Sequence, residues 1–144
     1  MAAFGFSGFE ELNNAFKRTA HVPDDVKKKM LESMADVAAK AEKESGERKG
    51  VRDPDSDVHI LDKIKVNKPK ITDDGGSISI TFSGSRKRGN TTTRNAEIAF
   101  INEFGKKGMP AKQFISSALK SKEKEIDEAG MKIYNEWFGK NFES

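Results

Sequence analysis

One stretch of the chain partly follows the phosphate-binding P-loop pattern G-x-x-x-x-G-K-[ST]. It runs from Gly84 to Thr91 and reads GSRKRGNT. In a working P-loop, the lysine neutralises phosphate charge and a helix follows directly, with its N-terminus toward the phosphate. Here Asn90 replaces the lysine, and the threonines that follow lead into a predicted strand. We therefore expect no nucleotide site in this loop.

The same loop is basic, and its charge suggests a different chemistry. Four cations, Arg86, Lys87, Arg88 and Arg94, lie in a segment without any apolar residue. They could contact a nucleic-acid backbone or an acidic protein, or they could simply keep an exposed loop soluble. No aromatic residue lies among them, so base stacking is not predicted.

Two other patterns look like metal sites only in part. Asp53, Asp55 and Asp57 alternate as in a calcium loop. However, Val58 replaces the turn glycine and Ile64 replaces the closing glutamate, so a capped turn is the better interpretation. The two histidines lack ligand spacing, and there is no cysteine to complete a zinc site. With no G-x-S-x-G nucleophile pattern either, the sequence predicts no metal, no cofactor and no enzymatic activity.

The composition indicates a protein with a thin core. Hydrophobic residues make up 35% of the 144 residues and charged residues 34%, which are low and high values for a globular domain. Such a chain either surrounds a small core with polar segments or obtains further burial from neighbouring subunits. The net charge of +3 indicates a mixed surface. We expect no signal peptide, no membrane span and a single domain over residues 1–144.

The N-terminal half is predicted to be mostly helical. A short strand is expected at 4–6, and the S-x-x-E pattern at 7–10 is a capping box that begins a helix. The clearest helix follows Pro23, and Gly46 is its predicted C-terminal stop. Residues 47–57 read as a mobile loop. The apolar stripe of the long helix, which we assign to the core, comprises Val26, Met30, Met34, Val37 and Ala41.

The C-terminal half is predicted to contain the sheet and the last helix. A short turn is expected at 58–64, followed by an antiparallel hairpin over 64–83, because apolar residues alternate in its second strand. We expect an exposed, mobile loop at 84–95, a strand at 97–100 and the last helix after Pro110. The apolar face of that helix comprises Ile115, Leu119, Ile126, Ile133 and Trp137. The predicted fold class is α+β, a small antiparallel β-sheet with the second and C-terminal helices packed on one face.

The segment from Ile98 to Phe114, IAFINEFGKKGMPAKQF, joins an apolar cluster, a glycine-bounded turn and a proline. Its order of aromatic-Glu-Phe-Gly, short loop, Met-Pro-Ala and Phe, before a long amphipathic helix, resembles the tail-component proteins of long-tailed bacteriophages. These are described as tail-completion or head–tail joining (neck) proteins. Residues Gly8 to Leu12 are similar to the opening helix of that family. The matching residues in the segment are Phe100, Glu103, Phe104, Gly105, Met109, Pro110, Ala111 and Phe114.

The resemblance implies a non-enzymatic structural protein of the virion, at the head–tail junction. Such proteins assemble as rings, usually of six copies, between the head connector and the tail terminator or tube proteins, and double-stranded DNA passes through the lumen. A ring needs head-to-tail contacts between copies. The expected subunit or partner contacts are Phe104, Gly105, Lys106, Lys107, Met109 and Pro110. Arg86, Lys87, Arg88 and Arg94 are expected to face lumen DNA or an acidic neighbour.

Two alternatives stay open on the sequence. One is a tail terminator, which caps the tail tube and has a composition that does not separate it from a neck protein. The other is a small DNA-binding protein that uses the basic loop. Duplex binding by such a protein would weaken steeply with salt.

Overall fold

The structure is a computed structural model, and it describes residues 4–5, 22–51, 60–73, 75–88 and 90–142. The helix predicted to begin at residues 7–10, both histidines and the three alternating aspartates lie outside these ranges, so those predictions stay untested.

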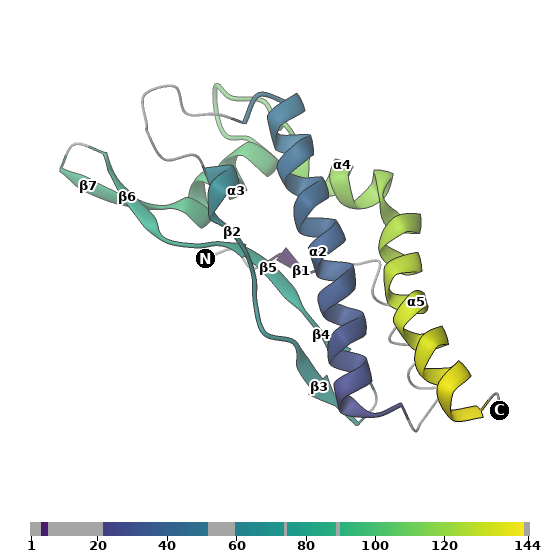
Figure 1. The fold of residues 1–144 in the computed structure, drawn as a ribbon. Coiled ribbons are helices and arrows are strands. Elements are labelled where there is room, and N and C mark those ends of the chain that lie inside the picture. The colour runs from purple at the N-terminus through teal and green to yellow at the C-terminus, as the bar shows by residue number, and fades with distance from the viewer. Residues whose placement is uncertain (1–3, 6–21, 52–59, 74, 89, 143–144) are drawn as a thin grey trace.

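The described elements confirm the predicted α+β class, with long helices and short antiparallel strands (Figure 1). In chain order they are β1 (Phe4–Gly5), α2 (Asp24–Arg48), the 3-10 turn η1 (Ile60–Lys63), β2 (Ile64–Val66), β3 (Lys70–Thr72), β4 (Gly75–Ser77), β5 (Ser79–Phe82), β6 (Ser85–Arg88), β7 (Thr91–Arg94), α3 (Asn95–Phe104), α4 (Phe114–Ser121) and α5 (Glu123–Phe142).

The predicted hairpin over residues 64–83 is confirmed, although it is divided into two paired parts. β2 pairs with β5 so that Ile64 lies opposite Phe82, and β3 pairs with β4 at the far end. β1 adds to the other edge of β5, which gives the strand order β1-β5-β2. Ile80 and Phe82 are buried, and Thr81 between them is not, as strand alternation requires.

The helix α2 is the longest element, and it passes the point where the sequence predicts its end. Gly46 lies inside the helix and is packed closely from outside. A Cβ at this position would meet the side chains of Leu61 and Phe114 at 2.5 and 3.2 Å. The helix ends instead in a Schellman motif at Gly50, which has φ +73°. The amide of Val51 donates to the carbonyl of Gly46 at 2.8 Å, and the amide of Gly50 donates to that of Glu47.

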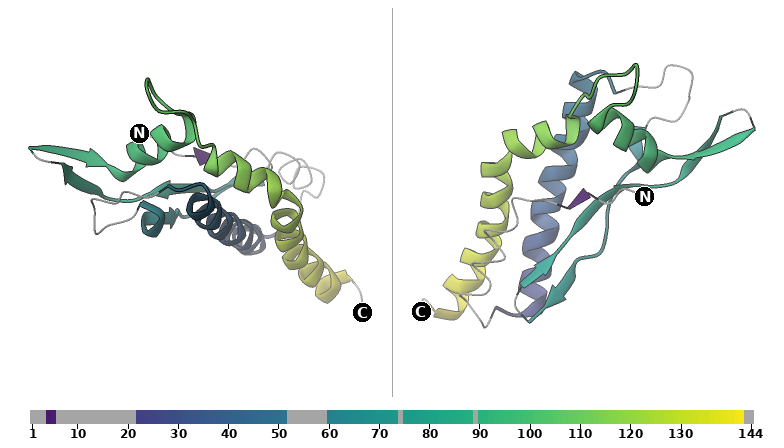
Figure 2. Two further views of the ribbon diagram at one scale, coloured as in Figure 1. Left: turned by 90° about the horizontal axis from the view of Figure 1, so that it is seen from above. Right: turned by 180° about the vertical axis from the view of Figure 1, so that it is seen from behind.

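Two clusters of buried side chains form the core, and α2 contributes most of the first. The predicted α2 stripe is confirmed as core, since Met30 and Met34 are fully buried. Figure 2 shows α2 lying on the strands, with α5 packed along its other side. The first cluster contains Val22, Val26, Met30, Leu31, Met34, Ala35, Ala38, Ile78, Ile80 and Ile126. The second contains Val51, Ile60, Leu61, Phe82, Ala96, Ala99, Phe114 and Ile115.

Two predictions between residues 84 and 104 are wrong. The expected loop at 84–95 is a second hairpin, in which β6 pairs with β7 and Lys87 lies opposite Thr92. The expected strand at 97–100 is the middle of helix α3. A run of four residues is too short to distinguish the two-residue period of a strand from the 3.6-residue period of a helix. The buried residues of α3, Ala96, Ala99 and Glu103, follow the helical spacing.

The last helix is interrupted, and it begins later than its proline suggests. α4 begins at Phe114, four positions after Pro110, and α5 begins after a break at Lys122. The predicted apolar face is nevertheless confirmed, because all five of its residues pack into or against the two core clusters.

Met34 provides a direct test of the first core cluster. We expect Met34→Ala to lower the free energy of unfolding by about 2–5 kcal/mol, because a fully buried side chain leaves a cavity when it is truncated. Urea unfolding followed by circular dichroism measures this change. Met131→Ala is the matched control, since Met131 is 38% exposed on α5, and its effect should stay within about 0.5 kcal/mol. Equal losses for the two variants would contradict the assigned core.

Candidate interaction surface

The exposed side of α3 carries a pair of aromatic rings. Phe100 is 47% exposed and Phe104 is 58% exposed. Their positions, four apart, place them on one helix face, and their ring centroids lie 4.7 Å apart. The helix turns Ala96, Ala99 and Glu103 inward at the same time. An exposed pair of large rings in contact with each other marks a candidate contact site.

The turn after α3 is held rigidly by backbone hydrogen bonds. Lys106 and Met109 form an isolated antiparallel bridge, and each donates its amide to the other's carbonyl at 2.9 Å. The chain then returns to α3, where the amide of Lys112 donates to the carbonyl of Asn102 at 2.8 Å. Of the predicted contact residues, Phe104, Lys106, Lys107 and Pro110 are exposed, whereas Gly105 and Met109 are half-buried.

Gly105 is required by this turn for two separate reasons. Its φ of 79° and ψ of 176° fall in a region that only glycine occupies readily. A Cβ at this position would also meet the backbone nitrogen of Ala111 at 2.7 Å and the carbonyl oxygen of Met109 at 2.8 Å. Its predicted role as a direct contact residue is untested, and its observed role is to let the returning chain pass close to α3.

Glu103 connects the end of α3 to the start of α4. The α4 N-cap residue, Gln113, has the left-handed values φ 49° and ψ 43° and makes no side-chain capping bond. The buried carboxylate of Glu103 accepts instead from the amides of Ile115 at 2.7 Å and Ser116 at 3.3 Å. It also accepts from the Ser116 hydroxyl at 2.7 Å. These are the bonds that an ordinary N-cap would supply, and the negative charge is favourable at a helix N-terminus.

A second buried carboxyl, Glu42 on α2, lies near Glu103 and lacks such partners. Glu42 is fully buried, and neither of its carboxyl oxygens has a hydrogen-bond partner among the described residues. Burial, together with the charge of Glu103, raises the pKa of Glu42 to about 8. The side chain is therefore protonated in the folded protein at neutral pH, which avoids the cost of burying two adjacent charges.

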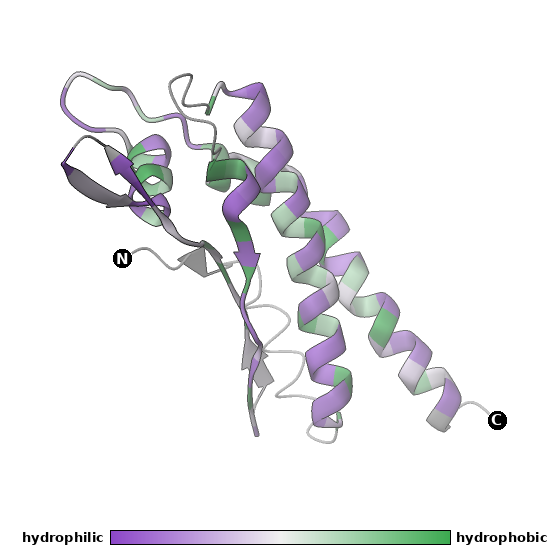
Figure 3. Cartoon of the chain, turned by 60° about the vertical axis from the view of Figure 1, so that its left-hand side comes forward, coloured by the Kyte–Doolittle hydropathy of each residue, from purple (hydrophilic) through white to green (hydrophobic). Residues whose placement is uncertain are grey.

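Three of the predicted basic loop residues lie on two faces of the hairpin β6–β7, and the side chain of the fourth, Arg88, lies outside the described part of the structure. Alternation and register put Arg86 on the same face as Thr93, while Lys87 and Arg94 share the opposite face. Arg86 is half-buried at the base of the hairpin, and its Nε donates to the side-chain oxygen of Asn95 at 3.4 Å. Lys87 and Arg94 are exposed. In Figure 3 the hairpin shows no strongly hydrophobic segment.

The structure does not bring the two predicted groups into one site. The hairpin joins the N-terminal end of α3, and the turn beginning at Gly105 leaves its C-terminal end. A helix of ten residues separates them by about 15 Å. The sequence prediction also missed Phe100 as a surface residue, because it assigned Phe100 to a strand. The spacing of four between Phe100 and Phe104 was the available signal.

Within the described ranges, no three His, Cys, Asp or Glu side chains come together in a group that could hold a metal ion. The helices in the described part of the chain include none that is both long and apolar enough to span a bilayer.

Replacement of Gly105 tests the rigid turn. We expect Gly105→Ala to lower stability by about 2–4 kcal/mol, because the side chain adds a backbone collision to an unfavourable φ. Gly108→Ala is the control, since Gly108 has φ +83° but nothing within 4 Å of the added Cβ, and it should cost only about 1 kcal/mol. Thermal and urea unfolding give both values. An equal cost at the two positions would show that close packing at Gly105 contributes nothing.

Glu42 is expected to make stability fall as the pH rises. Between the usual carboxyl pKa of 4.5 and the folded value of about 8, the unfolded chain loses the proton while the folded chain keeps it. The contribution of Glu42 to the free energy of unfolding is therefore fully present below pH 4.5. It declines by about 1.4 kcal/mol per pH unit across this window.

Glu42→Gln should remove this pH dependence. The free energy of unfolding of the variant, measured in urea, should therefore rise steadily relative to that of the wild type from pH 5 to pH 8. Glu44→Gln, on the exposed face of the same helix, is the control and should follow the wild-type profile. Parallel profiles for Glu42→Gln and the wild type would contradict the assignment.

Comparison with known proteins returned no match to a protein-family model, to a curated protein or to a solved structure.

Proposed function

We propose that the protein is a structural subunit of the neck of a long-tailed bacteriophage, where it joins the tail to the head connector as a ring around the DNA channel. The observation that carries the proposal is the exposed Phe100–Phe104 pair beside a rigid turn. This is the part of the chain whose sequence resembles tail-completion proteins. In this proposal, the aromatic side chains of Phe100 and Phe104 and the exposed cations Lys106 and Lys107 contact the next copy or a neighbouring protein.

A second exposed apolar patch makes a head-to-tail contact geometrically reasonable. On α5, Met131 is 38% exposed and Phe138 is 40% exposed. Figures 1 and 2 place α3 toward one end of the molecule and the C-terminal part of α5 at the other. A ring requires two different surfaces on each copy, and these patches are candidates for the two surfaces.

The direct test is a joining assay with particles assembled without the protein. Heads and tails would be purified from a phage whose copy of this gene is disrupted, then mixed with or without the purified protein. Negative-stain electron microscopy counts joined particles, and plating measures infectivity. We expect joining only when the protein is added. Normal joining without it would end the proposal.

Substitution of the aromatic pair tests the proposed contact surface. We expect the double variant Phe100→Ser/Phe104→Ser to reduce joining and ring formation by roughly 30-fold or more, because aromatic contact residues often contribute at least about 2 kcal/mol. Native mass spectrometry and the joining assay measure the two effects. Glu44→Ala/Glu47→Ala, on the exposed face of α2, is the control. Undiminished joining by a folded aromatic variant would exclude this surface as the contact.

A further inference from the structure

Strands β2 to β7 carry positive charge alone, whereas the helices carry both signs, and α2 by itself contains seven acidic and six basic residues. Strands β2 to β7 contain six basic residues and no acidic residue, namely Lys65, Lys70, Arg86, Lys87, Arg88 and Arg94. Helices α3 and α5 together contain seven acidic and three basic residues. The strands are therefore strongly basic although the net charge of the whole chain is modest. The sequence prediction recognised only the basic residues of the hairpin β6–β7.

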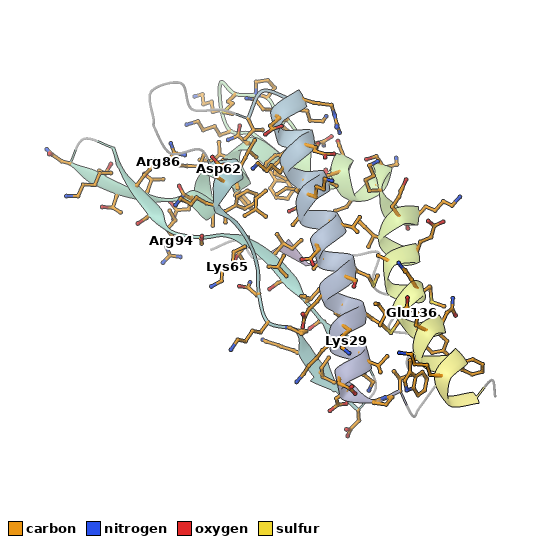
Figure 4. The ribbon with its side chains drawn as sticks, in the orientation of Figure 1. Lys29, Asp62, Lys65, Arg86, Arg94 and Glu136 are labelled. Atoms are coloured by element: carbon orange, nitrogen blue, oxygen red, sulfur yellow. The ribbon has the colours of Figure 1, made fainter. Side chains whose placement is uncertain are left out.

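Four of these cations lie on the side of the strands that faces away from α2. Lys65 alternates with Ile64 and Val66, which pack against the core, and Lys70 alternates with Ile71 in the same way. Figure 4 shows Lys65 and Arg94 projecting away from α2. Lys87 shares the hairpin face of Arg94. We call this surface, defined by Lys65, Lys70, Lys87 and Arg94, the outer strand face.

A hollow of about 450 Å³ joins the hairpin to the sheet on this face. Polar side chains from four elements or connections line it, including Asn67, Thr81, Ser85 and Arg94. Asn67 is held in place because its amide group donates to the Ser79 hydroxyl at 2.9 Å. The hollow thus combines the Arg94 cation with hydroxyl and amide groups, and Phe82, Gly84 and Ala96 complete its lining.

The four cations are available for a ligand. Each of them is exposed, and none forms an ion pair within the described part of the chain. The carboxylate of Asp62, at the start of the same region, is already paired with Lys43 at 3.2 Å. The outer strand face therefore presents positive charge that no described carboxylate neutralises.

We infer that the outer strand face binds the phosphodiester backbone of double-stranded DNA without sequence preference. Arginine, lysine, serine, threonine and asparagine side chains are the usual partners of backbone phosphates. A protein partner fits less well, because the large exposed apolar residues in the described part of the chain, Phe100, Phe104, Met131 and Phe138, all lie on helices, while protein interfaces are depleted in lysine. Among the described side chains of β2 to β7, no aromatic residue is exposed for base stacking, which favours a duplex over a single strand.

This inference takes its biological setting from the proposed function, since a neck ring encloses DNA, but its test uses the isolated protein and needs no ring. Fluorescence anisotropy with a labelled 30-bp duplex of mixed sequence measures the affinity between 50 and 200 mM salt. Four phosphate contacts predict a slope of about −3 to −4 in log K against log[salt], or a loss of about 100-fold over this range.

The double variant Lys65→Gln/Arg94→Gln should bind at least about tenfold more weakly at low salt and reduce the slope by about 2. Lys132→Gln/Lys140→Gln, with the same change of net charge on exposed positions of α5, is the control and should bind as the wild type does. Both side-chain changes are on the surface, so unchanged thermal unfolding should confirm that each variant folds.

Three outcomes of the binding experiment would overturn the inference, and a fourth would reassign the face. They are no duplex binding at low salt, equal losses for the strand and α5 variants, and tighter binding of a single strand than of the duplex. Loss of self-association in Lys65→Gln/Arg94→Gln, with duplex binding unchanged, would assign this face to a second copy instead. A negative result in DNA binding would leave the head–tail joining assay unaffected, so the two proposals fail separately.

Discussion

The carboxylate of Glu103 holds together the part of the molecule on which the proposed contact surface depends. It lies at the end of α3 and accepts hydrogen bonds from the first turn of α4. Because this bond set replaces the missing N-cap of α4, the two helices and the turn between them form one unit. That unit keeps Phe100 and Phe104 on a firm base while they remain exposed. A surface intended for contact gains from such preorganisation, since less order has to be created on binding.

Burial of the side chain, together with the nearby charge of Glu103, explains the unusual state of Glu42. Two ionised carboxylates in one buried region would repel each other, and only Glu103 has hydrogen-bond donors around it in the described structure. Glu42 therefore keeps its proton, with its pKa raised to about 8. Glu42 is thus a buried polar group without hydrogen-bond partners among the described residues. Its cost in stability depends on pH, and an uncharged side chain of the same shape would remove that dependence.

The same fold separates two kinds of surface. Helix α2 lies on the inner side of the strands, so their apolar residues face it and their basic residues face outward. The exposed rings lie on helices α3 and α5, which together carry seven acidic residues, whereas β2 to β7 carry none. An apolar patch and a basic face on different elements can serve two partners at once. In a ring subunit, one would contact a neighbouring protein and the other would contact DNA.

The sequence by itself determined the α+β class, the α2 stripe and the hairpin over residues 64–83, because long periodic segments show which side is buried. Residues such as Met34 and Ile80 were placed correctly for this reason. Where short-range signals conflict, only the tertiary structure decided which secondary structure the segment adopts. Gly46 was expected to end α2, yet it lies inside because Leu61 and Phe114 pack against it. The run at 97–100 was expected to be a strand, yet it is helical because Ala96 and Ala99 pack into the second core cluster. The capping role of Glu103 and the outer strand face depend on residues far apart in the chain, so no local pattern could reveal them.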